Sequence, residues 1–326
     1  MKVLSLFSGI GAFEKALDNL NLSWELVGYS EIDKAASRSY SAIHGVPESL
    51  NLGDITAVDE KALPKDIDLI TYGFPCQDIS SAGRQKGLFN ADGSPTRSGL
   101  FFDALRIIKE TQPRIAIAEN VKALTSEKFS AQFKIVLESL KAAGYNSYWQ
   151  VLNAKDYGVP QNRERVFIVS IRRDVDTGLF EFPKPVPLQT RLKDILDDEV
   201  DEKYYLPVNR NAGQAGASGK DRATAAAMRG RYNEDGKVEQ RVEVSDREYA
   251  NALTTVQKDS LIQNNLRIRK PTSKECFRLM GFDDTDFEKA AAVSSDTQLY
   301  KQAGNSIVVP VIERIFVEVR KEIKET

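Results

Sequence analysis

Short apolar runs alternate with amphipathic helical patterns up to about residue 173, and this alternation constrains the fold more than any other feature of the chain. The runs that predict strands are KVLSLF, WELVGYSEID, IDLITYGFP, RIAIAENV, NSYWQVLNA and RVFIVSIRR. Helical spacing of apolar residues appears in AFEKALDNL, AASRSYSAIH, LFFDALRIIKET and AQFKIVLESLKAAG. Because strands and helices that alternate in this way form βαβ units, we expect an α/β fold with a Rossmann-like, doubly wound and mostly parallel sheet.

The alternation stops after the proline-rich stretch FEFPKPVPLQT. Residues 194–265 are rich in Gly, Ala, Asn and Arg and show no repeated βα unit, so a second, smaller and irregular domain is predicted there. A helical pattern returns in the tail, after the Gly304-Asn305 turn. We therefore expect one domain made of residues 1–193 plus 298–326, a second at 194–265, and a connecting hinge at 266–297.

Composition excludes several classes of protein. Two cysteines and one histidine among 326 residues are too few for a metal cage or a disulfide framework, so no metal and a reducing cytoplasm are expected. No run of 18 apolar residues suggests a membrane span. Between Lys203 and Asn233, six Lys or Arg stand against one Asp. This asymmetry indicates a polyanionic partner, although a solvated basic loop explains the charge alone equally well.

Polar and glycine residues follow several predicted strands at the point where each strand ends. They comprise Ser8 to Gly11, Glu31, Asp54, Pro75-Cys76 and Glu119-Asn120. Ligands of open parallel sheets bind at the carboxyl ends of the strands, so these residues are expected to form one site.

The Gly-x-Gly at positions 9 and 11 allows a cofactor to approach the backbone closely. Its third glycine is missing, because position 14 is Glu, so the dinucleotide fingerprint is incomplete. The missing glycine argues against a pyrophosphate-bearing dinucleotide and leaves room for a smaller adenosyl ligand. Glu31, 20 residues after Gly11, has the spacing of an acidic residue that binds ribose hydroxyls. A tight structural turn remains an equal alternative for the Gly-x-Gly alone.

Cys76 stands directly after a proline in a predicted loop, which is an unusual place for an inert core cysteine. A nucleophilic thiol acts as the thiolate, and His44, within a predicted helix, is poorly placed to assist it. Arg163 and Arg165 alternate on a predicted strand and are the candidate cationic helpers, with a surface strand edge as the alternative. Glu119 is the candidate acid, with a helix N-cap salt bridge as the alternative.

Eight motifs occur in order with fitting spacings: LFSGIGAFE, SEIDKAA, GDIT, GFPCQDIS, ENV, NAKDYGVPQNRERVFIV, RKPTSKECFRLMGF and YKQAGNSIVVPVI. Together they closely resemble the DNA cytosine-5 methyltransferases of bacterial and phage restriction-modification type. The resemblance implies a class I S-adenosylmethionine-dependent methyltransferase fold, S-adenosyl-L-methionine as cofactor and double-stranded DNA as partner. A monomer in the cytoplasm of a bacterial cell or a phage-infected host is expected.

The resemblance also assigns roles. Cys76 would add to C6 of a flipped cytosine, Glu119 would hold N3 and the exocyclic amine, and Arg163 and Arg165 would contact O2 and orient the thiolate. These roles need no histidine, because Glu119 activates the ring and electrostatics favour the thiolate. The implied cofactor pocket consists of Phe7, Gly9, Ile10, Gly11, Glu31, Ile32, Asp54, Ile55, Pro75, Leu100 and Asn305.

DNA contacts are implied as well, since the base must leave the duplex before it can react. The polar Gly/Ser stretch 80–99 is predicted to be a lid over the flipped base, with a plain surface linker as the alternative. Residues 194–265 would read the sequence. The implied DNA-contacting residues are Gln77, Ser80, Arg84, Arg229, Arg231 and Thr254.

Three other functions compete with this interpretation. An RNA-directed relative would share the catalytic motifs, but the Cys-Phe-Thr signature of the tRNA-modifying branch is absent from the sequence. An inactive DNA-binding paralogue is disfavoured by the presence of Cys76, Glu119 and Arg165. A nicotinamide oxidoreductase is disfavoured by the missing third glycine and by the lack of an obvious hydride-site His or Tyr-Lys pair.

Overall fold

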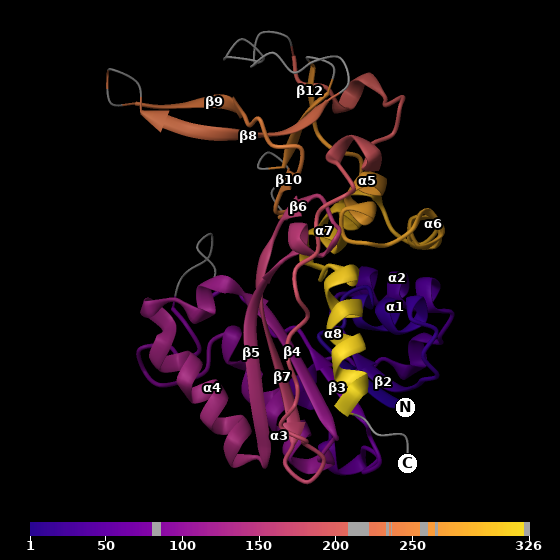
Figure 1. The fold of residues 1–326 in the computed structure, drawn as a ribbon, viewed down its shortest axis with the longest axis vertical. Helices are drawn as coiled ribbons and strands as arrows, with labels where there is room; N and C mark the ends of the chain where they lie inside the picture. Colours follow the sequence, from indigo (N-terminus) through magenta and orange to yellow (C-terminus); the bar gives the residue numbers. More distant parts are fainter. Residues whose placement is uncertain are drawn as a thin grey trace. The chain divides into compact units, whose positions relative to one another are not determined.

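The computed structural model describes residues 1–79, 86–207, 222–232, 235, 237–254, 260–264 and 267–322. The chain divides into two compact units (Figure 1). Unit 1 comprises residues 1–152, 164–184 and 311–326, and unit 2 comprises residues 153–163 and 185–310. These bounds describe packing only. The division of catalysis, hinge and sequence reading among 1–193 plus 298–326, 266–297 and 194–265 remains a prediction.

Unit 1 is built on a six-stranded sheet of order β2-β1-β3-β4-β7-β5. Its strands are β1 (Lys2–Leu6), β2 (Glu25–Ser30), β3 (Leu69–Tyr72), β4 (Ile115–Val121), β5 (Tyr145–Asn153) and β7 (Glu164–Arg172). The neighbours from β2 to β4 run parallel, and β7 runs antiparallel to β4. This is the doubly wound, mostly parallel sheet that the alternating pattern predicts.

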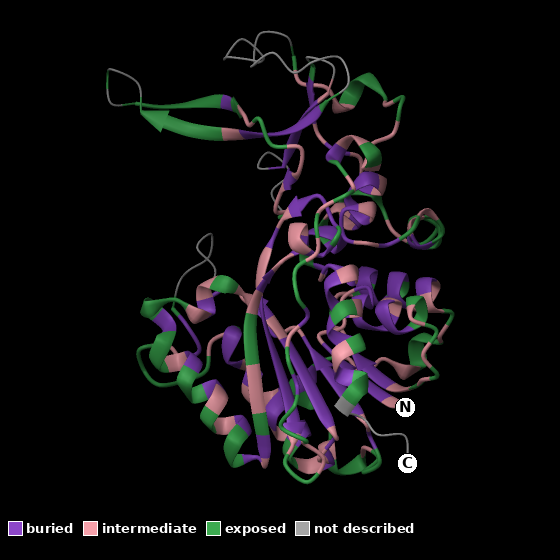
Figure 2. Cartoon of the chain, in the orientation of Figure 1, coloured by how far each residue is buried: buried purple, intermediate pink, exposed green. Residues whose placement is uncertain are grey.

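The helices of unit 1 are α1 (Ala12–Asn19), α2 (Lys34–His44), α3 (Phe101–Thr111), α4 (Ser130–Ala142) and most of α8 (Val309–Glu322). Helices α3 and α4 bury their apolar sides against one face of the sheet, where alternate strand residues such as Leu4, Ile70 and Ala116 form the core. Helices α1, α2 and α8 lie on the other side of the strands (Figure 1). The central strands are buried, as their colour in Figure 2 shows, whereas the edge strand β5 is partly exposed. Burial on both faces explains why the central strands read as continuous apolar runs.

The sheet register brings the carboxyl ends of four strands to one edge. Leu6 of β1 lies beside both Ser30 of β2 and Tyr72 of β3, and Tyr72 lies beside Ala118 of β4. The residues that follow these positions therefore emerge together. The loop after β1 and Glu31 lie over β1 and β2, while Cys76 and Glu119 lie over β3 and β4.

Unit 2 contains an antiparallel sheet of order β12-β11-β8-β9 and a two-stranded parallel pair, β6 with β10. The strands are β6 (Gln161–Asn162), β8 (Ala223–Tyr232), β9 (Val238–Val244), β10 (Ala250–Asn251), β11 (Leu261–Asn264) and β12 (Arg267–Arg269). Helices α5 (Ser273–Arg278), α6 (Asp284–Ala291) and α7 (Asp296–Asn305) follow. The described part of the region expected to be irregular is thus largely β. The sequence did not indicate this, because the alanine-rich β8 lacks the alternating apolar and polar pattern of a typical strand.

Short 3₁₀ turns connect these elements, at Glu48–Leu50, Ile55–Ala57, Glu60–Ala62, Ser98–Leu100, Lys122–Thr125, Glu127–Phe129, Ala154–Tyr157, Leu192–Ile195 and Glu202–Tyr204. Among the described residues, no helix combines the length and apolar character needed to cross a membrane.

Candidate active site

The turn that follows β3 carries Cys76. Its side chain is half-buried and forms no disulfide bond. The amide Nδ2 of Asn120 donates to the carbonyl of Phe74 at 2.9 Å, and the N–H of Ile79 donates to the carbonyl of Cys76 at 2.9 Å. The first bond holds the Pro75-Cys76 turn against the end of β4, and the second closes the turn itself. The thiol is therefore placed at the strand edge where ligands of such sheets bind.

The second cysteine provides a contrast. Cys276 on α5 is deeply buried, and burial raises the pKa of its thiol. A thiol that stays protonated is a poor nucleophile. Cys76 is thus the candidate nucleophile and Cys276 a core residue.

Glu119 and Arg165 form an ion pair on adjacent antiparallel strands. Val121 lies opposite Arg165 and Glu119 opposite Phe167, so the two charged side chains are diagonal neighbours on one face. Arg165 Nε lies 3.0 Å from Glu119 Oε1, and their side chains are only 19% and 12% exposed. The guanidinium therefore balances a largely buried carboxylate.

Arg163 lies in a different environment, although the sequence predicts that it shares a strand and a direction with Arg165. Strand β7 begins at Glu164, and the residues before Arg163 form β6, which pairs with β10 of unit 2. The guanidinium of Arg163 donates to the carbonyls of Leu253 (2.6 Å), Gly304 (3.1 Å) and Ser306 (2.7 Å). The residue is 3% exposed. Its charge is therefore engaged with the backbone of unit 2.

The loop between β1 and α1 is shaped by left-handed backbone conformations. Phe7, Gly9 and Gly11 have φ values of 53°, 57° and 81°. Such values suit glycine and are rare for a residue such as Phe7. Gly11 forms the N-cap of α1. A Cβ built on Gly9 would meet nothing within 4 Å, so the loop is open at Gly9.

Glu31, directly after β2, is bound to this loop. Its Oε2 accepts the N–H of Gly9 at 3.0 Å, and its Oε1 accepts the N–H of Asp33 at 2.7 Å. Burial raises the pKa of Glu31, and these N–H donors oppose that effect. Each carboxylate oxygen retains acceptor capacity, which ribose hydroxyls can use.

Asn51 fixes the backbone of Glu31 and is a residue that sequence reasoning missed. Its Oδ1 accepts the N–H groups of Glu31 and Gly53, and its Nδ2 donates to the carbonyl of Glu31 and to Ser37 Oγ. The signal was its position three residues before Asp54 in NLGDIT. Asn120, named only as a strand end, is a second missed residue, since it holds the Cys76 turn.

The remaining cofactor candidates in unit 1 differ in exposure. Ile32 is 73% exposed, which is unusual for a large apolar side chain next to a mostly buried carboxylate. Asp54 is exposed, and its Oδ1 accepts the N–H and Oγ1–H of Thr56, which lower its pKa. Ile10 and Ile55 are buried, whereas Pro75 and Leu100 are partly buried. Asn305, the exposed last residue of α7, belongs to unit 2, and its role remains a prediction.

The candidate DNA-contacting residues fall into three groups. Ser80 and Arg84, with the lid segment as far as Gln85, lie outside the described residues. Gln77 and Thr254 are exposed. Arg229 and Arg231 lie on the outer half of the β8–β9 ribbon, which is exposed on both strands (Figure 2).

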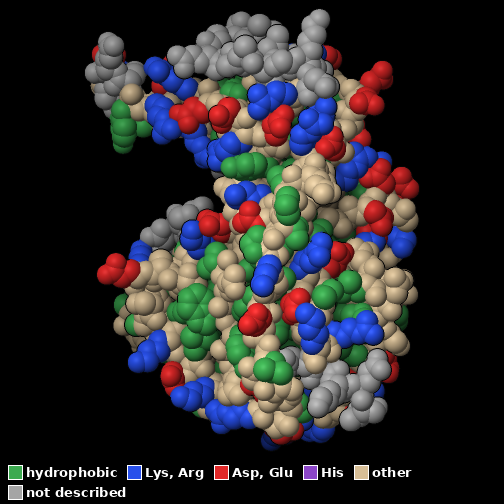
Figure 3. Space-filling view, viewed as in Figure 1, with side chains coloured by type: hydrophobic (Ala, Val, Ile, Leu, Met, Phe, Trp, Pro, Cys, Tyr) green, Lys and Arg blue, Asp and Glu red, His purple; other side chains and the backbone are tan. Residues whose placement is uncertain are grey.

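Charges of both signs gather along this ribbon (Figure 3). Arg231 donates from Nε and from one terminal nitrogen to the two carboxylate oxygens of Glu243, at 2.6 and 2.8 Å. Its bidentate partner is therefore across the ribbon. Arg229 lies opposite Arg241.

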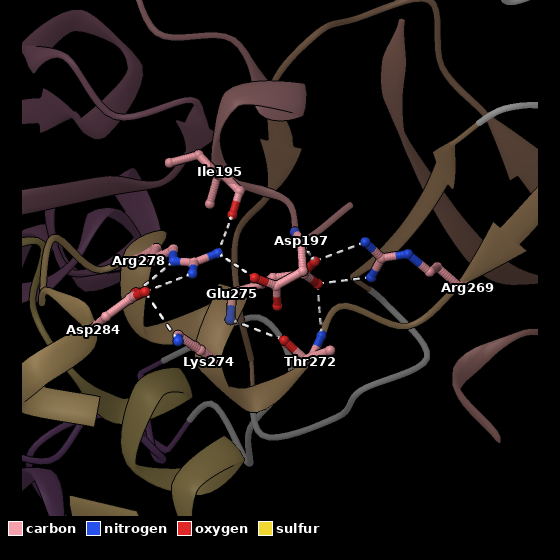
Figure 4. A network of polar contacts seen from close by, with 8 residues as sticks. All are labelled: Ile195, Asp197, Arg269, Thr272, Lys274, Glu275, Arg278 and Asp284. Carbon is pink, nitrogen blue, oxygen red and sulfur yellow. Dashed lines mark hydrogen bonds and ion pairs between the residues drawn. The ribbon is translucent and has the colours of Figure 1, made fainter. Parts of the chain in front are cut away.

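The motif RKPTSKECFRLMGF forms a polar network within unit 2 (Figure 4). Arg269 pairs with both carboxylate oxygens of Glu275 at 2.7 Å, and both side chains are fully buried. Glu275 also accepts the N–H groups of Asp197 and Thr272. Next to this pair, Arg278 bonds Asp284 and Asp197. These contacts give the motif a structural role within unit 2.

Comparisons with known proteins identify what this arrangement resembles. The family model described as C-5 cytosine-specific DNA methylase matches residues 1–321. The orphan methyltransferase M.SPRI of Bacillus phage SPR is 34% identical, over 98% of this chain and 97% of its own length. The type II methyltransferase M.NlaX of Neisseria lactamica is 37% identical, over 96% and 94%.

Among solved structures, the Dnmt2 methyltransferase of S. pombe has a similar fold. The TM-score is 0.69 at 20% identity, with full coverage of both chains. At this identity the likeness concerns the fold alone, and it confirms the expected fold class.

Proposed function

The chain belongs to the C-5 cytosine-specific DNA methylase family, and on this basis we propose that it methylates C5 of a cytosine flipped out of double-stranded DNA, through a covalent bond between Cys76 and C6. As a member of this family it is a DNA (cytosine-5)-methyltransferase, as the motifs predicted. The observation that carries the proposed mechanism is the convergence of Cys76 and Glu119 at the adjacent ends of β3 and β4, with Arg165 paired to Glu119.

Cys76 is the nucleophile in this proposal. Its thiolate adds to C6 of the cytosine, which makes C5 nucleophilic enough to take a methyl group. After C5 is methylated, loss of its proton and rupture of the C6–sulfur bond restore the aromatic ring and release the thiolate.

Glu119 and Arg165 hold the base in this proposal. The carboxyl of Glu119 bonds N3 and the exocyclic amine, where it stabilises the charge that develops as the thiolate attacks. Arg165 orients Glu119 and contacts O2. Arg163 was expected to make the same contact, but its three bonds to main-chain carbonyls favour a different task. We propose that Arg163 holds in place the segments that carry Thr254 and Asn305.

The residues after β1 and β2 fit S-adenosylmethionine, which supplies the methyl group when bound. The loop is open at Gly9, and Glu31 has acceptor oxygens for ribose hydroxyls. The exposed Ile32 offers an apolar surface for a face of the adenine, and Asp54 offers an acceptor for its exocyclic amine. Phe7, Ile10, Gly11, Ile55, Pro75 and Leu100 complete the part of the proposed pocket that lies in unit 1, and Asn305 of unit 2 is a candidate by its motif alone.

Sequence reading is assigned to residues 194–265. The β8–β9 ribbon places Arg229 and Arg231 on an exposed surface, and a two-stranded ribbon fits the major groove of DNA. The described residues contain no cluster of three or more His, Cys, Asp or Glu side chains suited to a metal ion. A mechanism that uses a thiolate, a carboxyl and arginines needs no such site.

The proposed adduct can be trapped with a duplex that carries 5-fluorocytosine at the target position. Fluorine cannot leave as a cation, so the reaction stalls after methylation and the protein stays bonded to the DNA. We expect an adduct stable to denaturing electrophoresis when the full-length protein, the duplex and S-adenosylmethionine are combined. The adduct should depend on the cofactor.

Cys76→Ser and Cys276→Ser form the matched pair of variants. Cys276→Ser should form the adduct, and Cys76→Ser should not, while Cys76→Ser keeps the cofactor affinity of the wild type. An adduct with the Cys76→Ser variant, or turnover within about tenfold of the wild type, would show that Cys76 is not the nucleophile.

A further inference from the structure

The only histidine of the chain, His44, lies directly behind the loop that the proposed function assigns to the cofactor. It is the last residue of α2, and its side chain is 1% exposed. Its Nε2 lies 3.1 Å from the carbonyl oxygen of Ile10, which stands between Gly9 and Gly11. Because a carbonyl oxygen only accepts, Nε2 is the donor, and this fixes where the ring carries a proton.

The ring of His44 also fills the space behind Gly11. A Cβ built on Gly11 would lie 2.1 Å from His44 Nε2 and 2.9 Å from Tyr40, whereas a Cβ on Gly9 would meet nothing. The two glycines therefore have different tasks. Gly9 leaves the loop open, and Gly11 allows α2 to press against the loop from behind.

Two carboxyl groups of α1 face the same ring. Asp18 Oδ2 lies 3.8 Å from His44 Nδ1, and Asp18 Oδ1 accepts the indole N–H of Trp24 at 2.8 Å. Burial acts to raise the pKa of Asp18, but the nearby His44 and the hydrogen bond from Trp24 outweigh it, and the pKa is lowered. Glu14, one turn earlier, is fully buried, which raises its pKa, while the nearby His44 opposes that effect. His44 thus joins the loop and the first helix to α2.

We propose that His44 is a positioning residue for S-adenosylmethionine binding: its Nε2–H bond to the carbonyl of Ile10 holds the Phe7–Gly11 loop in its binding conformation. The inference rests on the proposed function, because it assumes that this loop binds the cofactor. Without the bond, the loop has to be ordered when the cofactor binds, and that ordering weakens the observed affinity. The bond joins His44 to Ile10 and involves neither Cys76 nor Glu119, so we expect the chemical step to be unaffected once the cofactor is bound.

Two substitutions separate the hydrogen bond from the packing. His44→Gln keeps a terminal N–H donor within reach of the Ile10 carbonyl, and His44→Phe keeps an aromatic ring without a donor. The measurement is isothermal titration of S-adenosylmethionine into the full-length protein without DNA. We expect His44→Phe to raise the Kd about tenfold and His44→Gln to stay within about threefold of the wild type. Asp18→Asn, which keeps a polar side chain of the same shape near Nδ1 and leaves the bond to Ile10 in place, should also stay within that range.

Steady-state kinetics give the second readout. His44→Phe should raise the KM for S-adenosylmethionine and leave kcat at saturating cofactor unchanged, which a general loss of folded protein would not do. A thermal melt reports whether each variant is folded. If His44→Phe does not fold, His44→Met is measured instead, since its unbranched side chain adapts to irregular spaces and also lacks an N–H.

The outcomes distinguish the two hypotheses. If the wild type does not bind S-adenosylmethionine, the proposed function fails. If the wild type binds and the donor-less variant binds equally well, the proposed function stands and the role of His44 is refuted. The role is also refuted if His44→Gln loses as much affinity as the donor-less variant, because packing alone then explains the loss.

Discussion

Nε of Arg165 on β7 lies 3.0 Å from Oε1 of Glu119 on β4. The two residues are diagonal neighbours on antiparallel strands, so the rigid ladder of the sheet sets their separation. An ion pair that is formed before the substrate arrives fixes the orientation of the carboxyl group. In the proposed mechanism, Glu119 therefore need not be ordered at the moment of reaction, and such preorganisation lowers the cost of reaching the transition state.

Glu119→Gln should slow methyl transfer by about 10²–10⁴-fold and change DNA binding little. The amide still hydrogen-bonds the edge of the base, but it carries no negative charge that could stabilise a proton at N3 as the thiolate attacks. Single-turnover rates and DNA Kd values, measured on the same preparation, separate the two effects. Equal losses in rate and in binding would mean that Glu119 only positions the base.

The two arginines should respond differently to substitution by lysine. Arg165→Lys keeps a positive charge near Glu119 but loses the planar fork, so we expect kcat to fall with little change in the melting temperature. Arg163→Lys cannot reach three carbonyls at once, so we expect a lower melting temperature together with weaker DNA binding. If Arg163→Lys lowers only kcat and leaves the melting temperature unchanged, Arg163 contacts the base as the sequence suggested.

Arg229 and Arg231 should make different contacts with DNA. Glu243 already binds the Nε edge of Arg231 and fixes the direction of its guanidinium, so only N–H groups on the two terminal nitrogens remain for DNA, and we assign them to a phosphate. Arg231→Ala should therefore weaken binding to cognate and scrambled duplexes alike and reduce the salt dependence by about one charge. Arg229→Ala should reduce the preference for the cognate duplex by about 1–3 kcal/mol. Binding to both duplexes at two salt concentrations tests each arginine. If neither substitution changes affinity or specificity, the ribbon is not part of the DNA interface.

Replacing one partner of the buried pair Arg269–Glu275 should lower the free energy of unfolding strongly, whereas replacing both should lower it much less. Arg269→Met leaves the carboxylate of Glu275 buried with backbone donors only, so we expect a loss of about 3–5 kcal/mol in the free energy of unfolding. The double variant Arg269→Met with Glu275→Leu should recover most of this loss. Urea unfolding of the three proteins measures both effects, and equal losses in the single and double variants would contradict the argument.

Acid should weaken unit 2 through Asp284. Its hydrogen bond with Arg278 holds the pKa of this carboxyl below the ordinary value of 3.8, and Lys274 acts in the same direction. A carboxyl whose folded pKa is depressed stabilises the fold above its unfolded pKa, and the contribution is lost as the pH falls through the folded value. The difference in unfolding free energy between wild type and Asp284→Asn should thus be constant from pH 7 to 5 and shrink below about pH 4. A difference that grows on acidification would contradict the predicted direction of the pH dependence. Arg278→Gln, measured with and without Asp284→Asn, gives the interaction free energy of the Arg278–Asp284 pair.

The sequence predicted the doubly wound fold because its buried strands read as apolar runs, separated by segments with helical periodicity. The residues over β1 to β4 were predicted for the same reason, since Gly9, Glu31, Cys76 and Glu119 all follow strong apolar runs. The direction of Arg163 was not predictable from spacing, because the chain changes sheets between β6 and β7. The antiparallel sheet of unit 2 was missed because its alanine-rich strand has weak β propensity and its pairing is non-local.

The polar contacts around the site were beyond the reach of sequence patterns. Asn51, Asn120 and His44 act through bonds to main-chain atoms that lie 20, 46 and 34 positions away in the chain. Residue types such as Asn are common in loops for many reasons, so their identity alone indicates no partner. Only the folded register brings donor and acceptor together.

The three carbonyls bound by Arg163 have an evolutionary consequence. A main-chain oxygen is present at every position whatever the side chain, so no substitution at 253, 304 or 306 removes the acceptor. Arg163 can therefore hold segments whose sequences diverge freely around it. If the proposed reading segment binds DNA, its side chains can change to suit a new target while Arg163 still donates to the carbonyl of Leu253.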